Sequence, residues 1–588
     1  MFVFWATLNM HSAPSPDSSR SRQTRFAPAA AGLTLVVCVA QALGTPAHAA
    51  PPENAPLPRE LLHPSEQTAP HPQATPLAGP PPAPPAPCPF AGSDQAFVLR
   101  GVEVSGYSGD AATVEAAFAG YKNRSVTLDQ ICRLRDAAVQ SIANSGRLAR
   151  LDFPPQSLAS GVLHLVATEA RITRLAVRGA PPKLDRRLRA LLGAELGRPL
   201  EMARLQRGLF LANDLPGVRI EIALAPDDQT ATPGGLVLNI SAQSRPESGM
   251  AHLSNSGSAS DGRWLSTARL ELDGWADAGS LGALTISRSP LHDRQSVAEL
   301  EGDSRPWANG FVLHAEASYG LSRPRGAVSP LDSTTRTTTL RTETQDWLVR
   351  DRREDVVVAA GLEAVDSATL SLGARLSQDV IRVAYVRTQW RQSWTGSGAF
   401  PGGENHMLVE GRQGLDLLGA LRPEARWLSR PGADPQAGLI RLDTLSTLFV
   451  TPRLQASLAA HIQEAGQRLV AYETFGLGDA TVGRGYDPSA LSGDHGASIS
   501  AELRQTLSLP VRAFSGLSLL AFYEAGRVST LHVAGSTRSL ASTGLGVEIP
   551  VGPRLNLSAT LAHPLERLSL GARMPRDRLL VSLTLLPF

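Results

Sequence analysis

Polar and apolar residues alternate with a period of two through much of residues 246–588, and this pattern limits the possible folds more than any other in the sequence. One example is the apolar series Leu555, Leu557, Ala559 and Leu561, which is interrupted by single polar residues. Successive side chains of a β-strand point to opposite faces, so each such segment has one apolar and one polar face. Lipid on one side and an aqueous lumen on the other require this arrangement.

These segments predict an antiparallel β-barrel that spans a membrane. Every backbone group in lipid must be hydrogen-bonded, so a membrane-spanning sheet has to close on itself. Outside the N-terminal region the sequence has no run of about 18 or more apolar residues, which excludes membrane-spanning helices there. Strands of about 9–11 residues allow either fourteen or sixteen strands within residues 249–588.

Charge and motifs exclude several classes of function. The chain has 588 residues, with 56 Lys or Arg against 54 Asp or Glu. This balance argues against a nucleic-acid-binding protein, which would have a basic stripe. We find no motif of a nucleotide-binding loop, a serine hydrolase or a zinc protease, and the 13 His residues are scattered. We therefore expect no enzyme activity, no metal, no cofactor and no nucleic-acid partner.

The first 49 residues have the parts of a secretory signal peptide. Three Arg residues between positions 20 and 25 precede an apolar run over residues 29–42, and Ala47-His48-Ala49 offers a cleavage site. Translation starts at either Met1 or Met10. The pattern predicts export from the cytoplasm.

A proline-rich linker and two cysteines follow the predicted signal peptide. Residues 51–90 contain 15 Pro, which lack backbone N–H donors and favour an extended chain, so we expect a linker over residues 50–90. After cleavage the only cysteines are Cys88 and Cys132. An isolated pair in an oxidising compartment predicts a disulfide bond between them.

Residues 91–245 contain two similar modules of mixed α and β pattern. Alternating apolar residues end at Gly106 and again at Gly179, which lies 73 residues later. In the first module Thr127 and Gln130 form a T-x-x-Q capping box, after which apolar residues recur with helical spacing until Gly146. The second module repeats this pattern with a helix over residues 200–211 and strands over residues 218–223 and 235–241. In each module the pattern predicts strands and helices in the order β-α-α-β-β.

The sequence Arg484-Gly485-Tyr486, within a Gly- and Asp-rich stretch at residues 475–494, resembles the Val-Arg-Gly-Phe/Tyr loop of the POTRA-barrel superfamily. Gly483 replaces the usual Val. Phe522-Tyr523-Glu524 resembles the Phe-x-Asp strand motif of that superfamily, with Glu in place of Asp. The two modules are similar to POTRA domains, and Asn255-Ser256-Gly257 with Gly262 and Arg263 resembles the first barrel strand of the family.

The closest resemblance is to the outer-membrane transporters of two-partner secretion, the haemolysin and filamentous-haemagglutinin type. It implies a barrel of sixteen transmembrane strands, preceded by two periplasmic POTRA domains. It also implies that the loop folds into the barrel, where Arg484 meets Glu524 on the inner wall, with Gly485, Tyr486 and Phe522 beside them. We predict the following parts: signal peptide 1–49, Pro-rich linker 50–90, POTRA 1 at 91–171, POTRA 2 at 172–245 and barrel 246–588.

The resemblance implies a pore that exports one large unfolded exoprotein from the periplasm to the cell surface without ATP. Extended peptides add to exposed strand edges through backbone hydrogen bonds, so we expect a cargo-binding edge in POTRA 2. Its residues are Val218, Arg219, Ile220, Glu221 and Ile222. Other expected partners are outer-membrane lipid and the barrel-assembly machinery, whose recognition signal the terminal Phe588 resembles.

Other functions fit parts of the same sequence. A general insertase of outer-membrane barrels belongs to the same superfamily, although such insertases resemble chains with three or more modules. A passive solute porin would not need the two modules. A soluble binding protein would not need the long alternating region.

Overall fold

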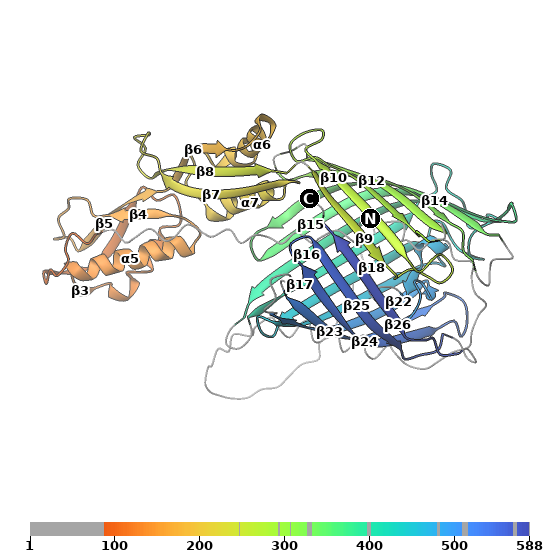
Figure 1. The fold of residues 1–588 in the computed structure, drawn as a ribbon. Helices are drawn as coiled ribbons and strands as arrows, with labels where there is room; N and C mark the ends of the chain where they lie inside the picture. Colours follow the sequence, from red (N-terminus) through yellow and green to blue (C-terminus); the bar gives the residue numbers. More distant parts are fainter. Residues whose placement is uncertain are drawn as a thin grey trace, which may run out of the picture. The chain divides into compact units, whose positions relative to one another are not determined.

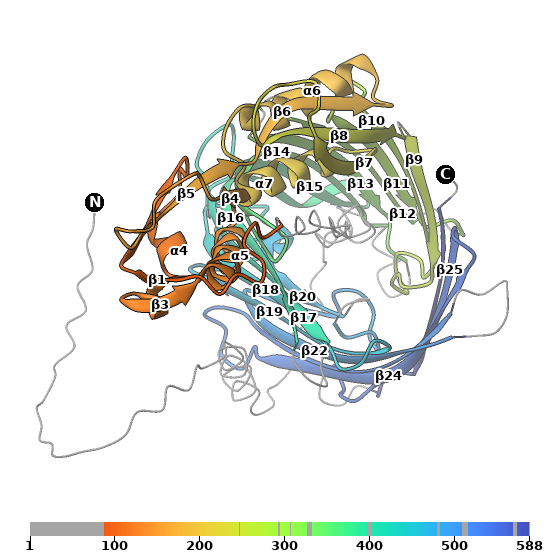
Figure 2. The same cartoon turned by 90° about the vertical axis from the view of Figure 1, so that its left-hand side faces the viewer.

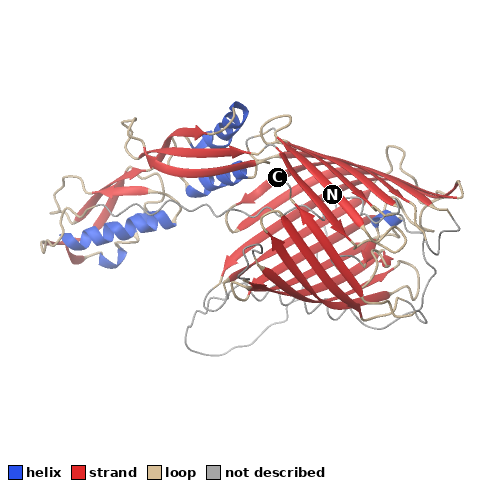
Figure 3. Ribbon diagram, viewed as in Figure 1, coloured by secondary structure: helices blue, strands red, loops and turns tan. Residues whose placement is uncertain are grey.

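The computed structural model describes residues 87–588 except 246, 292–293, 306, 308, 326–331, 397–400, 479–481, 509–515, 569–572 and 587–588. The predicted signal peptide, nearly all of the Pro-rich linker and the terminal Phe588 lie outside these residues. Within the described part no helix is long and apolar enough to cross a membrane. The chain forms two small α+β modules and a closed β-barrel (Figure 1; Figure 3, coloured by secondary structure).

The first module packs helices against a three-stranded sheet. The sheet has the order β2-β5-β4, and β1 pairs with β3 in a separate two-stranded sheet. The elements are β1 (Ala96–Leu99), β2 (Gly101–Ser105), α4 (Ala112–Glu115), β3 (Arg124–Thr127), α5 (Leu128–Asn144), β4 (Ala149–Asp152) and β5 (Val162–Glu169). The predicted β-α-α-β-β order is present here, with the β1–β3 pair added to it.

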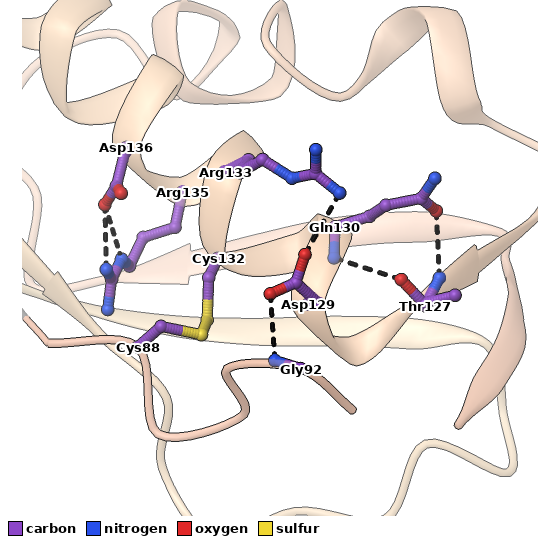
Figure 4. The surroundings of a disulfide bond; sticks show 9 residues. All are labelled: Cys88, Gly92, Thr127, Asp129, Gln130, Cys132, Arg133, Arg135 and Asp136. Atoms are coloured by element: carbon purple, nitrogen blue, oxygen red, sulfur yellow. Dashed lines mark hydrogen bonds and ion pairs between the residues drawn. A yellow bond between two sulfur atoms is a disulfide. The ribbon is translucent and has the colours of Figure 1, made fainter. Parts of the chain in front are cut away.

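Helix α5 begins and ends as its sequence predicts. The Thr127 side chain accepts a hydrogen bond from the Gln130 N–H, and the Gln130 side chain accepts one from the Thr127 N–H (Figure 4). Gly146, just past the helix, has φ 81°, a left-handed conformation that glycine adopts without strain. Ile131, Ala138 and Ile142 point from the helix into the module's core. Cys132, on the same helix, is bonded to Cys88.

The second module has the predicted order, with a short 3-10 helix, η2 (Gly193–Glu195), between its two helices. Its elements are β6 (Arg171–Arg178), α6 (Pro182–Leu192), α7 (Met202–Asn213), β7 (Val218–Pro226) and β8 (Gly235–Ser244). The sheet order β6-β8-β7 leaves β7 at an edge. The helices cover one face of this sheet and bury a core of mainly Leu and Ile side chains. Strands β7 and β8 each extend three residues beyond their predicted ends. Strand β6 begins at Arg171, one residue before the predicted start of the second module.

Sixteen antiparallel strands close into the barrel, which confirms the count that the family resemblance implied (Figure 2). They are β9 (Glu247–Ser254), β10 (Leu265–Asp273), β11 (Leu281–Arg288), β12 (Gln295–Ser304), β13 (Val312–Ser322), β14 (Thr334–Arg350), β15 (Glu354–Ser371), β16 (Ala374–Thr395), β17 (Gly402–Gly414), β18 (Gly438–Phe449), β19 (Leu454–Ala465), β22 (His495–Leu507), β23 (Leu517–Ser529), β24 (Arg538–Val551), β25 (Leu555–Pro564) and β26 (Arg578–Leu585). Among the described residues β26 and β9 pair at four positions, fewer than any other two neighbouring strands of the barrel.

The alternation of the sequence becomes the two faces of the barrel wall. On β12, Leu300 is 61% exposed on the outer face, whereas its neighbour Glu299 is 1% exposed on the inner face. On β15, Leu362 and Glu363 show the same contrast. Apolar side chains therefore face the membrane and acidic side chains face the lumen.

One motif lies elsewhere than expected. We predicted that residues 255–257, with Gly262 and Arg263, belong to the first barrel strand, but β9 ends at Ser254. These residues form the connection from β9 to β10, where Gly257 and Gly262 approach each other closely. A Cβ atom on Gly257 would lie 2.2 Å from the Gly262 carbonyl oxygen, so only glycine fits at position 257.

Candidate functional site

The connection between β19 and β22, residues 466–494, is the candidate functional site, and we call it the inner loop. It contains a 3-10 turn (Ala471–Glu473) and two short strands, β20 (Phe475–Leu477) and β21 (Leu491–Gly493), which pair with each other. Both short strands contact β23, and β20 also contacts β22. The loop therefore lies against the inner wall of the barrel.

Arg484, in the inner loop, contacts three side chains of the wall. Its Nε atom lies 2.8 Å from Glu524 Oε1 in an ion pair, and its Nη2 atom donates to Glu502 Oε2 at 3.0 Å. The guanidinium carbon lies 4.2 Å from the centre of the Phe522 ring, a cation–π distance. The predicted residues Arg484, Phe522 and Glu524 are thus brought together.

Glu524 binds the backbone of the inner loop as well as the guanidinium. Its side chain is fully buried, and Oε2 accepts hydrogen bonds from the N–H groups of Gly483 (2.8 Å) and Arg484 (3.0 Å). The Ser542 hydroxyl donates a third bond to the same oxygen at 3.0 Å. These bonds join the carboxylate to the loop backbone as well as to the wall, so Glu524 fixes the position of the loop tip.

Gly483 and Gly485, on either side of Arg484, are needed for different structural reasons. Gly483 has φ 90°, a conformation that a β-branched Val would adopt only with strain. This backbone conformation directs the Gly483 N–H to Glu524. Gly485 has no positive φ, but a Cβ there would lie 3.0 Å from the Pro564 nitrogen, so it allows close approach to the wall.

Tyr486 ties the inner loop to the connection that follows β25. Its hydroxyl lies 2.9 Å from the Ala541 carbonyl oxygen and 2.8 Å from that of Glu566, and it accepts a bond from the Glu566 N–H. The ring is buried in an apolar cluster with Leu477, Val482, Leu491, Val528 and Leu540. Tyr486 therefore both packs and orients the loop.

Glu502 and Ser542 complete this site, and no sequence motif indicates either residue. Both lie on strands beside β23: Ser542 pairs directly with Glu524, and Glu502 pairs with Phe522. Glu502 and Ser542 could be predicted only from the register in which β22 and β24 pair with β23, and the sequence does not reveal that register. Among the described residues, no group of three or more His, Cys, Asp or Glu is arranged to hold a metal ion.

Strand β7, which contains the residues 218–222 of the predicted edge, lies at one edge of its sheet. Within the described residues, β7 has β8 as its single strand partner. Arg219 and Glu221 are exposed, whereas Ile220 is buried towards the helices. At the end of β7, hydrogen bonds from Thr173, Gln229 and Thr230 hold the pKa of Asp227 below its ordinary value, which fixes the strand's end.

A family model described as haemolysin secretion/activation protein ShlB/FhaC/HecB matches residues 234–549, more than half of the chain. The chain belongs to this family. As a member of the haemolysin secretion/activation family it is an outer-membrane transporter of two-partner secretion, with its POTRA domains in the periplasm. The inner loop is therefore the sixth connection on the extracellular side, because β9 leaves the periplasmic end.

Individual relatives agree with this assignment. The chain is 24% identical over 449 residues to the outer membrane transporter CdiB of Escherichia coli O6:K15:H31 (strain 536 / UPEC), covering 72% of each protein. It is similar in fold to the solved structure of CdiB from Escherichia coli, with TM-score 0.72, 19% identity and coverage of 86% of this chain and 94% of that one. CdiB from Acinetobacter baumannii gives TM-score 0.63, 16% identity and coverage of 94% and 97%.

A structure of BamA from Haemophilus ducreyi lacking POTRA domains 1–3 has a similar fold as well. Its TM-score is 0.51, with 12% identity and coverage of 83% of this chain and 99% of that one. At this identity the likeness is one of fold alone.

Proposed function

We propose that this transporter exports one large exoprotein, unfolded, and that the inner loop closes the pore until the cargo arrives. The observation that supports closure is the buried contact of Arg484 with Glu524, because it holds an extracellular loop inside the lumen. Folding of the cargo outside the cell would drive transport, so neither ATP nor a cofactor is needed. The transporter is not an enzyme in this proposal.

Deletion of the gene tests the proposed cargo. We expect the loss of one large exoprotein from the cell surface and culture medium, while other outer-membrane proteins keep their amounts. The measurement is a comparison of both proteomes with and without the gene, and re-expression of the intact chain is the control. A general fall in outer-membrane proteins would instead support a barrel insertase, and no change in either proteome would contradict a dedicated cargo.

We further propose that β7 binds the cargo by adding an extended cargo segment to the sheet. An edge strand has unpaired N–H and C=O groups, which bind a peptide without regard to most of its side chains. Such binding suits an unfolded polypeptide, because the polypeptide offers backbone groups along its whole length.

Photo-crosslinking checks this edge. A photoactivatable residue at Glu221 on β7 should crosslink to the cargo in cells, whereas the same residue at Arg178 on β6, the opposite edge of the sheet, should not. Both positions are exposed, so the two variants differ mainly in the edge of the sheet at which the photoactivatable residue lies. Equal crosslinking at the two positions, or crosslinking at Arg178 alone, would contradict a binding site on β7.

A further inference from the structure

The inner loop contacts the barrel wall at a second place, on strands that precede β19 in the ring, whereas Glu524 lies on β23. Glu473, in the 3-10 turn of the loop, faces Arg412 on β17. Arg412 donates from Nη2 to Glu473 Oε1 at 2.7 Å and from Nε to Glu473 Oε2 at 3.1 Å. This bidentate geometry is the strongest form of an arginine–carboxylate pair.

Neighbouring groups of the wall extend this contact. Arg412 also donates to Glu363 on β15 at 2.9 Å, and Arg441 on β18 donates to Glu473 Oε2 at 3.0 Å. From the loop, the Tyr472 hydroxyl donates to the other oxygen of Glu363 at 2.5 Å. Two adjacent loop residues are therefore bonded to three strands.

The contact is shielded from solvent. The side chains of Arg412, Glu363 and Glu473 are 1%, 0% and 8% exposed. Exposed ion pairs are weak because water and salt compete with them, but a buried pair with satisfied hydrogen bonds has no such competitor. Loss of one partner would leave a buried charge, so the loop has little freedom to leave this place.

The two contacts hold different parts of the loop on different arcs of the wall. Arg484, at the loop tip, binds β22 and β23, whereas Tyr472 and Glu473, in the first part of the loop before β20, bind β15, β17 and β18. In the ring β19 stands between the two arcs. Breaking the Arg484 contact alone therefore leaves the part of the loop before β20 attached inside the lumen.

We propose that Arg412 and Glu473 form a second anchor of the inner loop, and that the pore opens fully only when both anchors are broken. The inference rests on the proposed role of Arg484 in closing the pore. Arg412 and Glu473 are positioning residues, since they act on the cargo path through the loop. Tyr472 and Glu363 support the same anchor.

Single-channel currents of the full chain in planar lipid bilayers test the second anchor. The proteins are wild type, Arg484→Ala, Glu473→Gln and the double variant. We expect each single variant to open more often than wild type, and the double variant to be open about tenfold longer than Arg484→Ala. Heat-modifiable migration in detergent shows that each barrel is folded.

Glu410→Gln is the matched control. Glu410 contacts the same arginine at 3.3 Å but lies on β17, in the wall and not in the loop. We expect Glu410→Gln/Arg484→Ala to behave as Arg484→Ala. Tyr472→Phe removes one hydroxyl from the loop without changing any charge. Tyr472→Phe/Arg484→Ala should therefore also open for longer than Arg484→Ala, even if Glu473→Gln prevents folding.

Three results would overturn the second anchor. If Arg484→Ala alone opens as fully as the double variant, one anchor is enough and only this inference fails. If Glu410→Gln has the same effect as Glu473→Gln, the wall charge and not the loop contact controls opening. If no variant, Arg484→Ala included, changes the current, the closing role of the inner loop fails together with the second anchor.

Discussion

Replacement of Glu524 by Ala should lower the free energy of unfolding by about 3–5 kcal/mol, since removing one partner of a buried ion pair leaves the other charge uncompensated. The change also leaves the N–H groups of Gly483 and Arg484 without their acceptor. We expect the inner loop to leave its place beside β23, and the urea midpoint of the protein in lipid vesicles to fall. Currents should show brief openings, because the Arg412–Glu473 contact remains.

Two further variants show whether the effect depends on burial and charge. Glu502→Ala removes another carboxylate bound to Arg484, but Glu502 is 17% exposed and also pairs with Arg504. Its cost should be about 1 kcal/mol or less, as for partly exposed pairs. Glu524→Asp keeps the charge and matches the usual residue of the superfamily, so it should retain part of the stability. Equal losses for Glu524→Ala and Glu502→Ala would contradict the central role of Glu524.

Loss of the Cys88–Cys132 bond should destabilise the first POTRA domain by about 4 kcal/mol, the value that the chain-entropy model gives for a loop of this length. The bond joins residues 44 positions apart and fixes the segment before β1 to helix α5 (Figure 4). Without it that segment is held by weaker contacts, such as the 3.2 Å bond from the Gly92 N–H to Asp129 and the packing of Phe90 on Phe153.

Hydrogen exchange of the full chain measures this loss. In the double variant Cys88→Ser/Cys132→Ser, the amides of α5 should exchange faster, while those of the barrel strands should be unchanged. A reductant added to the wild-type protein should have the same effect, because the chain has only three cysteines and the third, Cys38, lies in the predicted signal peptide. Unchanged exchange in α5 would contradict a stabilising role of the disulfide.

Local patterns in the sequence were enough to predict most of the architecture. The alternation around Leu555 predicted a strand, and Thr127 with Gln130 predicted the start of α5, because both depend on residues close in the chain. The 73-residue repeat predicted two modules of the same order. The choice of sixteen strands over fourteen needed the family resemblance, because polar connections of varied length conceal where each strand ends. The same difficulty explains why residues 255–257 were assigned to β9 instead of the connection after it.

The alternating barrel, the two POTRA domains, the cysteine pair and the Arg484–Glu524 motif can all be predicted from the amino-acid order, since each depends on nearby residues or on a recurring motif. The other contacts of the inner loop become visible only in the folded chain. Arg412 and Glu473 are 61 residues apart, and Glu524 receives the N–H groups of a loop 40 residues before it. Which lumen residues meet depends on the register of sixteen paired strands and on closure of the ring, and no short stretch of sequence encodes either.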